Sequence, residues 1–296
     1  MNDIICIGEV LWDSLPSGLF PGGASYNVAN ILHQLGVQSF LVSRIGDDKS
    51  GSDLFNLIKG HGVDTTGIQL DPENTTGQVE VRLDLKNEPV YDIKIPAAWD
   101  FIEYNNDLEE RASKARAIVF GSLAQRNTKS RKTIRKLLDS HVLKIFDINL
   151  RHPFIDTSHV DYSLKKADIL KLNMDELVQL NKWFNIPGNE NESLRKIMQI
   201  YDLVAVFLTK GEGGAKLLYQ DQLFFHSGYK IELVDPVGAG DAFLAAAVKT
   251  FLADESGEAI LHYANAVAAN VAAKKGATPI LDLGEIQELI FRSKKK

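Results

Sequence analysis

The chain contains a single cysteine and no long apolar run. Cys6 lies in the short apolar segment Ile4–Ile7. One cysteine cannot form an internal disulfide, which favours a reducing compartment. No apolar stretch approaches the ~20 residues of a membrane span, and Ile4–Ile7 is too short for the apolar core of a signal peptide. We therefore expect a cytoplasmic protein without a membrane partner.

An excess of positive charge is also missing. The 33 Lys and Arg residues are outnumbered by 39 Asp and Glu, which gives a formal net charge of −6. This balance argues against general binding to nucleic acids or membrane surfaces. An anionic ligand would have to be held by local groups such as helix N-termini, backbone amides and a metal ion. The seven histidines show no paired metal-ligand spacing, so no zinc site is expected.

Two common nucleotide-binding motifs are absent. A dinucleotide-binding fold needs Gly-x-Gly-x-x-Gly between its first strand and a helix, where this chain has only Gly8. The glycine-rich loop at 211–214 precedes an apolar run, Ala215–Tyr219, that is itself a predicted strand. No Gly-x4-Gly-Lys-Ser/Thr occurs either. A dinucleotide-dependent oxidoreductase and a P-loop enzyme are therefore disfavoured.

What the sequence does contain is an alternation of short apolar runs with helical spacing. The predicted buried strands are 4–7, 39–42, 117–120, 144–147, 169–172 and 203–208, and the predicted helices between them are 25–35, 51–61, 127–140, 175–182 and 193–201. This alternation predicts an α/β fold with a doubly wound, mostly parallel sheet and helices on both faces.

Residues 76–95 depart from this pattern. Polar and apolar residues alternate through Gln78–Leu85, and Asn87-Glu88 is the predicted turn into Val90–Ile95. Such a period of two predicts a hairpin with one exposed face. With the stretch near 12–21 it would form a small lid, from about 12–21 and 76–100, on a single domain covering 1–296. Lid strands can pair between subunits, so a homodimer through the lid is left open.

The strongest chemical signal is the segment Asp235–Asp241, which opens the helical run Ala242–Phe251. The small residues Gly238-Ala239-Gly240 let backbone amides converge on an anion at a helix N-terminus, where the helix dipole also favours negative charge. A carboxylate beside that site can accept a proton from an attacking hydroxyl, as phosphoryl transfer requires. In the alternative interpretation, Asp241 only caps the helix.

A second glycine motif, Gly22-Gly23-Ala24-Ser25-Tyr26-Asn27, also leads into a helix. In sheets of this type ligands bind beyond the carboxyl ends of the strands. Asp13 and Asn27 would then offer an acceptor and an amide to the hydroxyl groups of a polyol. The alternative is that Asn27 caps the helix and Asp13 is solvated.

Together the two glycine motifs resemble the paired signatures of the ribokinase-like (PfkB) sugar kinase family. Three further segments match family patterns: Asp147-Ile148-Asn149-Leu150-Arg151, Asn173-Met174-Asp175-Glu176 and Thr209-Lys210-Gly211. The resemblance spans essentially the whole chain. It implies an ATP- and Mg²⁺-dependent kinase that transfers the γ-phosphoryl group to a sugar hydroxyl.

Within that family the sequence is most similar to fructokinases. The segments that carry this similarity are Gly8–Asp13, Pro89-Val90-Tyr91, Ala98-Trp99-Asp100 and Phe120–Ala124. Fructose is the favoured substrate, and ribose, 2-keto-3-deoxygluconate and a nucleoside are alternatives. A non-catalytic sugar-binding regulator is the alternative of another class, because it would keep the pocket without needing Asp241.

The resemblance implies a role for each matching residue. Asp241 would be the base, within an anion hole of Gly238, Ala239 and Gly240, and Arg151 would lie near the transferred phosphate. The residues implied for sugar binding are Asp13, Gly22, Gly23, Asn27 and Asp241. Those implied for the nucleotide are Asn173, Glu176, Thr209, Gly211, Gly214, Gly238, Gly240 and Asn265, with Glu176 organising Mg²⁺ indirectly.

Some positions depart from the usual family pattern. Pro236 replaces a common threonine in a loop that, with Lys275-Gly276-Ala277, hosts a monovalent cation in some members. Asp235 is the candidate residue for K⁺, and the need for K⁺ is left open. Tyr26 is expected to narrow the sugar pocket. Three side chains keep two interpretations each: Trp12 and Trp99 stack on the sugar or pack in the core, and Lys210 contacts phosphate or is solvated.

Overall fold

The computed structural model describes residues 4–15, 18–83 and 89–293. The chain divides into two compact units, Met1–Val142 and Leu143–Lys296. Each unit has a mostly parallel sheet flanked by helices, which confirms the predicted α/β fold class. Within the described residues no helix is both long and apolar enough to cross a membrane. The assignment of 1–296 to a single kinase domain stays a prediction.

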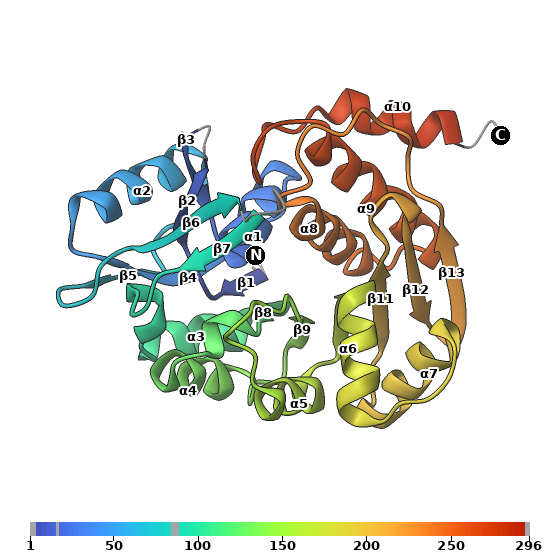
Figure 1. Ribbon diagram of the computed structural model, residues 1–296, viewed down its shortest axis with the longest axis horizontal. Helices are drawn as coiled ribbons and strands as arrows, with labels where there is room; N and C mark the ends of the chain where they lie inside the picture. Colours follow the sequence, from blue (N-terminus) through green and yellow to red (C-terminus); the bar gives the residue numbers. More distant parts are fainter. Residues whose placement is uncertain (1–3, 16–17, 84–88, 294–296) are drawn as a thin grey trace. The chain divides into compact units, whose positions relative to one another are not determined.

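The main sheet of unit 1 has four parallel strands in the order β8-β1-β4-β5 (Figure 1). Their bounds are Ala117–Gly121, Ile4–Ile7, Ser39–Gly46 and Ile68–Asp71. All residues of β1 are buried, as expected for an apolar parallel strand covered on both faces. Helix α1 (Ala24–Gln34) packs on β1, β4 and β8. The other helical segments are α2 (Lys49–Gly60), η1 (Ala98–Phe101), α3 (Asn106–Lys114), η2 (Leu123–Gln125) and α4 (Thr128–Leu137).

A second sheet in unit 1 is built from strands of the two segments predicted to form the lid, and its action as a lid stays a prediction. Its order is β3-β2-β6-β7, with bounds Gly18–Gly22, Leu11–Leu15, Gly77–Leu83 and Pro89–Ile93. β6 and β7 pair antiparallel, so the expected hairpin strands are confirmed. β2 pairs antiparallel with β3 and parallel with β6. Asp84-Leu85 and the predicted turn at Asn87-Glu88 lie outside the described residues.

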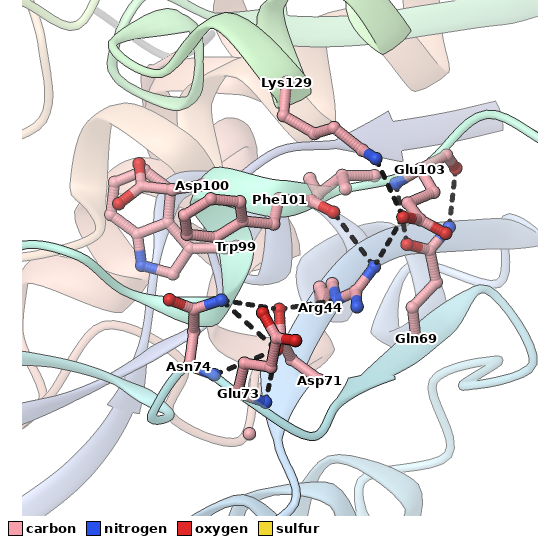
Figure 2. Close-up of polar contacts among 12 residues, drawn as sticks. Arg44, Gln69, Asp71, Glu73, Asn74, Trp99, Asp100, Phe101, Glu103 and Lys129 are labelled. Carbon is pink, nitrogen blue, oxygen red and sulfur yellow. Dashed lines mark hydrogen bonds and ion pairs between the residues drawn. The ribbon is translucent and has the colours of Figure 1, made fainter.

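A polar network around Arg44 fixes the segments that flank the lid strands (Figure 2). Arg44, on β4, places its Nε 2.8 Å from Oδ2 of Asp71 at the end of β5. Its Nη1 donates to the carbonyl oxygen of Phe101 at 3.1 Å. Oδ1 of Asp71 accepts the backbone N–H groups of Glu73 and Asn74, both at 2.9 Å. The chain entering β6 and the end of η1 are thereby both tied to β4.

A buried ion pair holds the other end of the hairpin. Nε of Arg126 lies 2.7 Å from Oδ1 of Asp100, and both side chains are at most 5% exposed. Nη2 of Arg126 also donates to the carbonyl oxygen of Lys94 at 2.8 Å, just after β7. The guanidinium group lies 3.9 Å from the centre of the Trp99 ring, and Trp99 is fully buried. Trp99 therefore packs in the core, as does Trp12, whose Nε1 donates to the carbonyl oxygen of Ser50 at 3.0 Å.

Unit 2 contains the strands in the order β9-β10-β11-β12-β13. β9 (Leu143–Asp147), β10 (Ile169–Asn173) and β11 (Ala205–Thr209) are parallel, whereas β12 (Ala215–Tyr219) and β13 (Gln222–His226) are antiparallel. The helical segments are α5 (Thr157–Lys166), α6 (Met174–Phe184), α7 (Glu190–Tyr201), η3 (Gly211–Gly213), α8 (Ala239–Phe251), α9 (Gly257–Ala272) and α10 (Leu283–Ser293).

Helix α8 is positioned by its packing against β11 and α9. α6 and α7 pack on β11, and α9 packs on β12 and β13. The rings of Phe207, on β11, and Phe243, on α8, meet edge to face with centroids 6.0 Å apart. Buried alanines line both α8 and α9, which lets the two helices approach closely. The carboxyl ends of β9, β10 and β11 lie at one edge because the strands are parallel.

Arg126→Met should destabilise unit 1. The change removes the partner of the buried Asp100 carboxylate, and breaking a buried pair from one side costs about 3 kcal/mol or more. We expect a lower midpoint in urea unfolding followed by circular dichroism. The matched control is Arg292→Met, since Arg292 pairs with Glu288 where both side chains are exposed, and such pairs contribute at most about 1 kcal/mol. Equal midpoints for the two variants would contradict the role given to Arg126.

Candidate active site

The N-terminus of α8 has the backbone geometry expected of an anion site. Gly238 is the N-cap, with φ of 78°, and has no side chain to cap the helix. A Cβ at Gly238 would collide with the backbone of Ala277. Glycine is therefore required twice, for its left-handed backbone and for this close approach. The N–H group of Ala239 donates to the carbonyl oxygen of Pro236 at 3.2 Å. The N–H groups of Gly240 and Asp241 complete the first turn, at the end of the helix where the dipole favours an anion. Asp241 stands in this first turn and is half-buried.

Asp235 shapes the loop in front of α8. Its Oδ1 accepts the N–H group of Val237 and its Oδ2 accepts that of Gly276, both at 3.0 Å. The carboxylate thus ties the segment before α8 to the segment after α9. These are the two loops named as a candidate monovalent-cation site, and binding of K⁺ there stays a prediction.

Asn173 and Glu176 form a capping box at the start of α6. Oδ1 of Asn173 accepts the N–H group of Glu176 at 2.9 Å, and Oε2 of Glu176 accepts that of Asn173 at 2.8 Å. Oε1 of Glu176 reaches the N–H group of Leu150 at 2.9 Å. Burial raises the pKa of the Glu176 carboxyl, against the opposing effect of the Lys171 ammonium. Glu176 therefore fixes the loop after β9, which fits an indirect role toward a metal.

Lys171, which no motif singled out, is a buried lysine close to the start of α8. It lies on β10, opposite Asp147 on β9, and its Nζ is 2.9 and 3.1 Å from the two carboxylate oxygens of Asp147. Both side chains are at most 7% exposed. The signal that could have found it is a charged residue within the apolar run Ile169–Leu172. Asp147 was recognised only as part of a motif, without a role.

The other predicted residues of unit 2 lie on β11, in the turns and on α9. Thr209 ends β11, beside Asn173 in the strand register. Gly211 and Gly214 have φ of 57° and 80° in the turn that follows. Nζ of Lys210 lies 2.8 Å from Oε2 of Glu190, so this lysine has an ion-pair partner. Arg151 is exposed, and its Nη1 donates to the carbonyl oxygen of Leu150 at 3.0 Å. Asn265 is buried on α9, where its Nδ2 donates to the carbonyl oxygen of Leu261 at 2.7 Å.

Apart from Asp241, which stands in unit 2, the residues expected to bind the sugar lie in unit 1. Asp13 is on β2, and a Cβ at Gly22, the last residue of β3, would collide with its carboxylate. Gly23 is the N-cap of α1, with φ of 102°, and its carbonyl oxygen accepts the N–H group of Asn27 at 2.9 Å. Oε1 of Glu9, which sequence analysis did not single out, accepts the N–H group of Ala24 at 3.2 Å. This carboxylate caps α1 in place of the missing glycine side chain.

Tyr26 does not have the predicted role. Its side chain is fully buried, and its hydroxyl group lies 2.7 Å from Nδ1 of His61 at the end of α2. The ring thus packs between α1 and α2, because at this position on α1 it faces the core.

The arrangement in unit 2 suits transfer of an anionic group. A helix N-terminus supplies oriented N–H groups, Asp241 supplies a carboxylate, and Lys171 supplies a fixed positive charge nearby. Among the described residues no group of three or more His, Cys, Asp or Glu could hold a metal ion.

Comparison with known proteins agrees with this chemistry. The sequence profile of pfkB family carbohydrate kinases matches residues 17–282. The chain belongs to this family. It is 28% identical to fructokinase-2 of Oryza sativa subsp. japonica, over 99% of this chain and 95% of the relative. It is also 30% identical to a Pyrococcus horikoshii protein, over 93% of this chain and 91% of that one. The solved structure of that Pyrococcus horikoshii protein, described as an uncharacterized sugar kinase, superposes on this chain with a TM-score of 0.81. The match covers 97% of this chain and 99% of the Pyrococcus chain.

The fold comparison is equally extensive. A fructokinase with bound ATP from Xylella fastidiosa superposes with a TM-score of 0.85 over 99% of both chains at 23% identity. The predicted ribokinase-like fold is confirmed. The pfkB match confirms the predicted enzyme class, a carbohydrate kinase that transfers a phosphoryl group to an alcohol. The roles of individual site residues stay predictions.

Gly238→Ala should impair both folding and activity. The variant would strain the left-handed backbone and press the new methyl group against Ala277. The matched control is Gly36→Ala, because Gly36 has φ of 77° and a Cβ added there would meet nothing within 4 Å. Both changes carry the backbone cost of about 1–2 kcal/mol, so a larger drop in melting temperature for Gly238→Ala measures the collision. Equal melting temperatures with full kinase activity would contradict the close approach.

Proposed function

We propose that this carbohydrate kinase transfers the γ-phosphoryl group of ATP to a hydroxyl group of fructose. The observation that carries the proposal is the first turn of α8, where Asp241 follows the Gly238–Gly240 backbone within an otherwise uncapped helix start. The curated relatives named fructokinase support the choice of sugar. Ribose, 2-keto-3-deoxygluconate and a nucleoside are the alternative acceptors, and a non-catalytic sugar-binding regulator is the alternative of another class.

In the proposed mechanism Asp241 acts as general base. It takes the proton of the attacking hydroxyl as the new phosphorus–oxygen bond forms, and the bond between the γ-phosphorus and the β,γ-bridging oxygen breaks. The N–H groups of the first turn of α8 stabilise the charge on the transferring group. Asp13 and Asn27 orient the sugar. Magnesium, when bound with ATP, would neutralise phosphate charge, and Glu176 would hold the loop at 150 in place for it.

The deciding experiment is an ADP-release assay with magnesium-ATP and a panel of acceptors. Fructose, ribose, 2-keto-3-deoxygluconate, tagatose, glucose and a nucleoside would be compared by kcat/KM, with and without K⁺. The highest kcat/KM for fructose supports the proposal. A higher kcat/KM for another acceptor would change the assigned substrate but not the type of reaction. If no acceptor causes ADP release, the non-catalytic sugar-binding regulator is favoured.

Asp241→Asn should lower kcat by about 10²-fold or more, because the amide cannot accept the proton. Thermal melting should remain near that of the unmodified protein, since Asp241 is only half-buried. Asp254→Asn is the matched control, an exposed aspartate near the opposite end of α8. Near-normal turnover by a folded Asp241→Asn variant would refute the assignment of the base.

Asp13→Asn should act mainly on the sugar. The variant keeps the shape of the side chain but replaces one acceptor oxygen with a donor, so we expect a KM for sugar raised about tenfold or more. The KM for ATP should change little. An unchanged KM for every active sugar would contradict the binding role of Asp13.

A further inference from the structure

Lys171 occupies a buried strand position, where the charged side chain of a lysine lowers the stability of the folded protein unless it is compensated. Its neighbours on β10, Ile169, Leu170 and Leu172, are almost fully buried, and Lys171 itself is 6% exposed. Removing an ammonium group from water costs several kcal/mol unless other charges and hydrogen bonds replace the solvent. An aliphatic residue would fill this strand position without that cost, so the lysine calls for an explanation beyond packing.

The nearest compensation comes from β9. Asp147, also buried, accepts two hydrogen bonds from Nζ of Lys171, at 2.9 and 3.1 Å. On the other side of β10 the register neighbour on β11 is Phe207, which carries no charge. The pair is therefore oriented across β9 and β10, and it could stabilise the sheet by itself.

A second contact shows that Lys171 also reaches α8. A Cβ added at Gly240 would lie 3.3 Å from Nζ of Lys171 and 4.0 Å from its Cε, and no atom of Asp147 lies within 4 Å of that point. The ammonium group is therefore the part of the pair next to the first turn of α8. Gly240 is adjacent in sequence to Asp241, so the positive charge lies beside the first turn of α8, close to the proposed anion site.

Three carboxylates act on this one ammonium group. Burial alone would lower the pKa of Lys171, but the carboxylates of Asp147 on β9, Glu176 on α6 and Asp241 on α8 raise it above its usual value. Lys171 therefore stays charged throughout the physiological range. Without it, the negative charges of these three carboxylates would repel one another and the anionic phosphoryl group that is to be bound nearby.

We propose that Lys171 is a positioning residue for phosphoryl transfer, whose ammonium group lets the ionised Asp241 and the transferring phosphoryl group stand together at the N-terminus of α8. Lys171 acts through the backbone and charge of the first turn, without itself touching the reacting atoms. The inference rests on the proposed function, since it assigns the same Asp241 and the same helix start. A methyl group at position 240 would lie 3.3 Å from Nζ of Lys171, so the glycine gives the ammonium group room beside the first turn.

The test compares Lys171→Met with the double variant Lys171→Met/Asp147→Asn. The single variant leaves the Asp147 carboxylate buried and unpaired, so both its melting temperature and its activity should fall. The double variant removes both charges and should recover most of the melting temperature. We expect its kcat to remain about 10- to 100-fold below that of the unmodified enzyme, the scale of losing one preorganised electrostatic group.

The pH profile gives a readout that a structural role would not change. A nearby positive charge lowers the pKa of a carboxyl group by about one unit or more. If the acidic limb of the kcat/KM profile reflects protonation of the base Asp241, removing Lys171 should move that limb to higher pH in both variants. Arg126→Met/Asp100→Asn, the same exchange in the buried pair of unit 1, should leave that limb in place. Lys171→Arg keeps the charge and should retain the original limb.

Two outcomes would overturn the inference. One is a double variant whose kcat recovers together with its melting temperature, which would make the pair structural only. The other is an acidic limb that stays in place in a folded Lys171→Met variant. Failure of the proposed function is separate, because it would appear as an unmodified protein that phosphorylates none of the acceptors.

Discussion

The uncapped start of α8 is the constraint on which the rest of the site depends. The first N–H groups of a helix have no partner within the helix, and Gly238 offers no side chain to satisfy them. A start of this kind has to be held by its surroundings. Ala277 closes on Gly238 from one side, Asp235 anchors the preceding loop to Gly276, and Lys171 lies behind Gly240. These contacts hold the turn in shape, and the Ala239 N–H group adds a hydrogen bond to the carbonyl oxygen of Pro236.

Charge balance explains why buried carboxylates collect at this edge of unit 2. Asp147 and Glu176 are both almost fully buried, and each has its own partners. Asp147 is satisfied by Lys171, and Glu176 by the backbone N–H groups of Leu150 and Asn173. Buried charges with complete hydrogen bonding hold rigid geometry, since any displacement leaves a charge without a partner. The ends of β9 and β10 are thus fixed relative to each other within unit 2.

Unit 1 uses the same principle around its lid strands. Arg44 and Arg126 each connect a buried carboxylate to a backbone carbonyl group in a flanking segment (Figure 2 shows the Arg44 network). Close backbone approaches complete the arrangement, because Gly22 and Gly23 leave space for the Asp13 carboxylate and the backbone of Glu9. The residues of unit 1 predicted to bind sugar stand on β2, β3 and the start of α1, which the close approaches at Gly22 and Gly23 bring together.

The sequence by itself determined the fold class, the hairpin strands and the family. Strands such as Ile4–Ile7 were predictable because apolar runs and helical spacing are local patterns. The motifs around Asp13, Gly23, Asn173 and Asp241 were recognisable because anion binding and capping depend on residues close together in the chain.

Only the tertiary structure decided what distant residues do to one another. The pairing of Lys171 with Asp147 and its approach to Gly240 bring together residues 24 and 69 positions apart along the chain, and no local pattern encodes such contacts. Trp99 and Tyr26 show the same limit. The sequence around an aromatic residue does not show whether its side chain faces a ligand or the core. In the structure Trp99 is buried against Arg126, and Tyr26 is buried with its hydroxyl group next to His61. Secondary structure and motifs depend on residues that are close in the sequence, whereas burial and charge compensation arise only when distant residues meet in the folded chain.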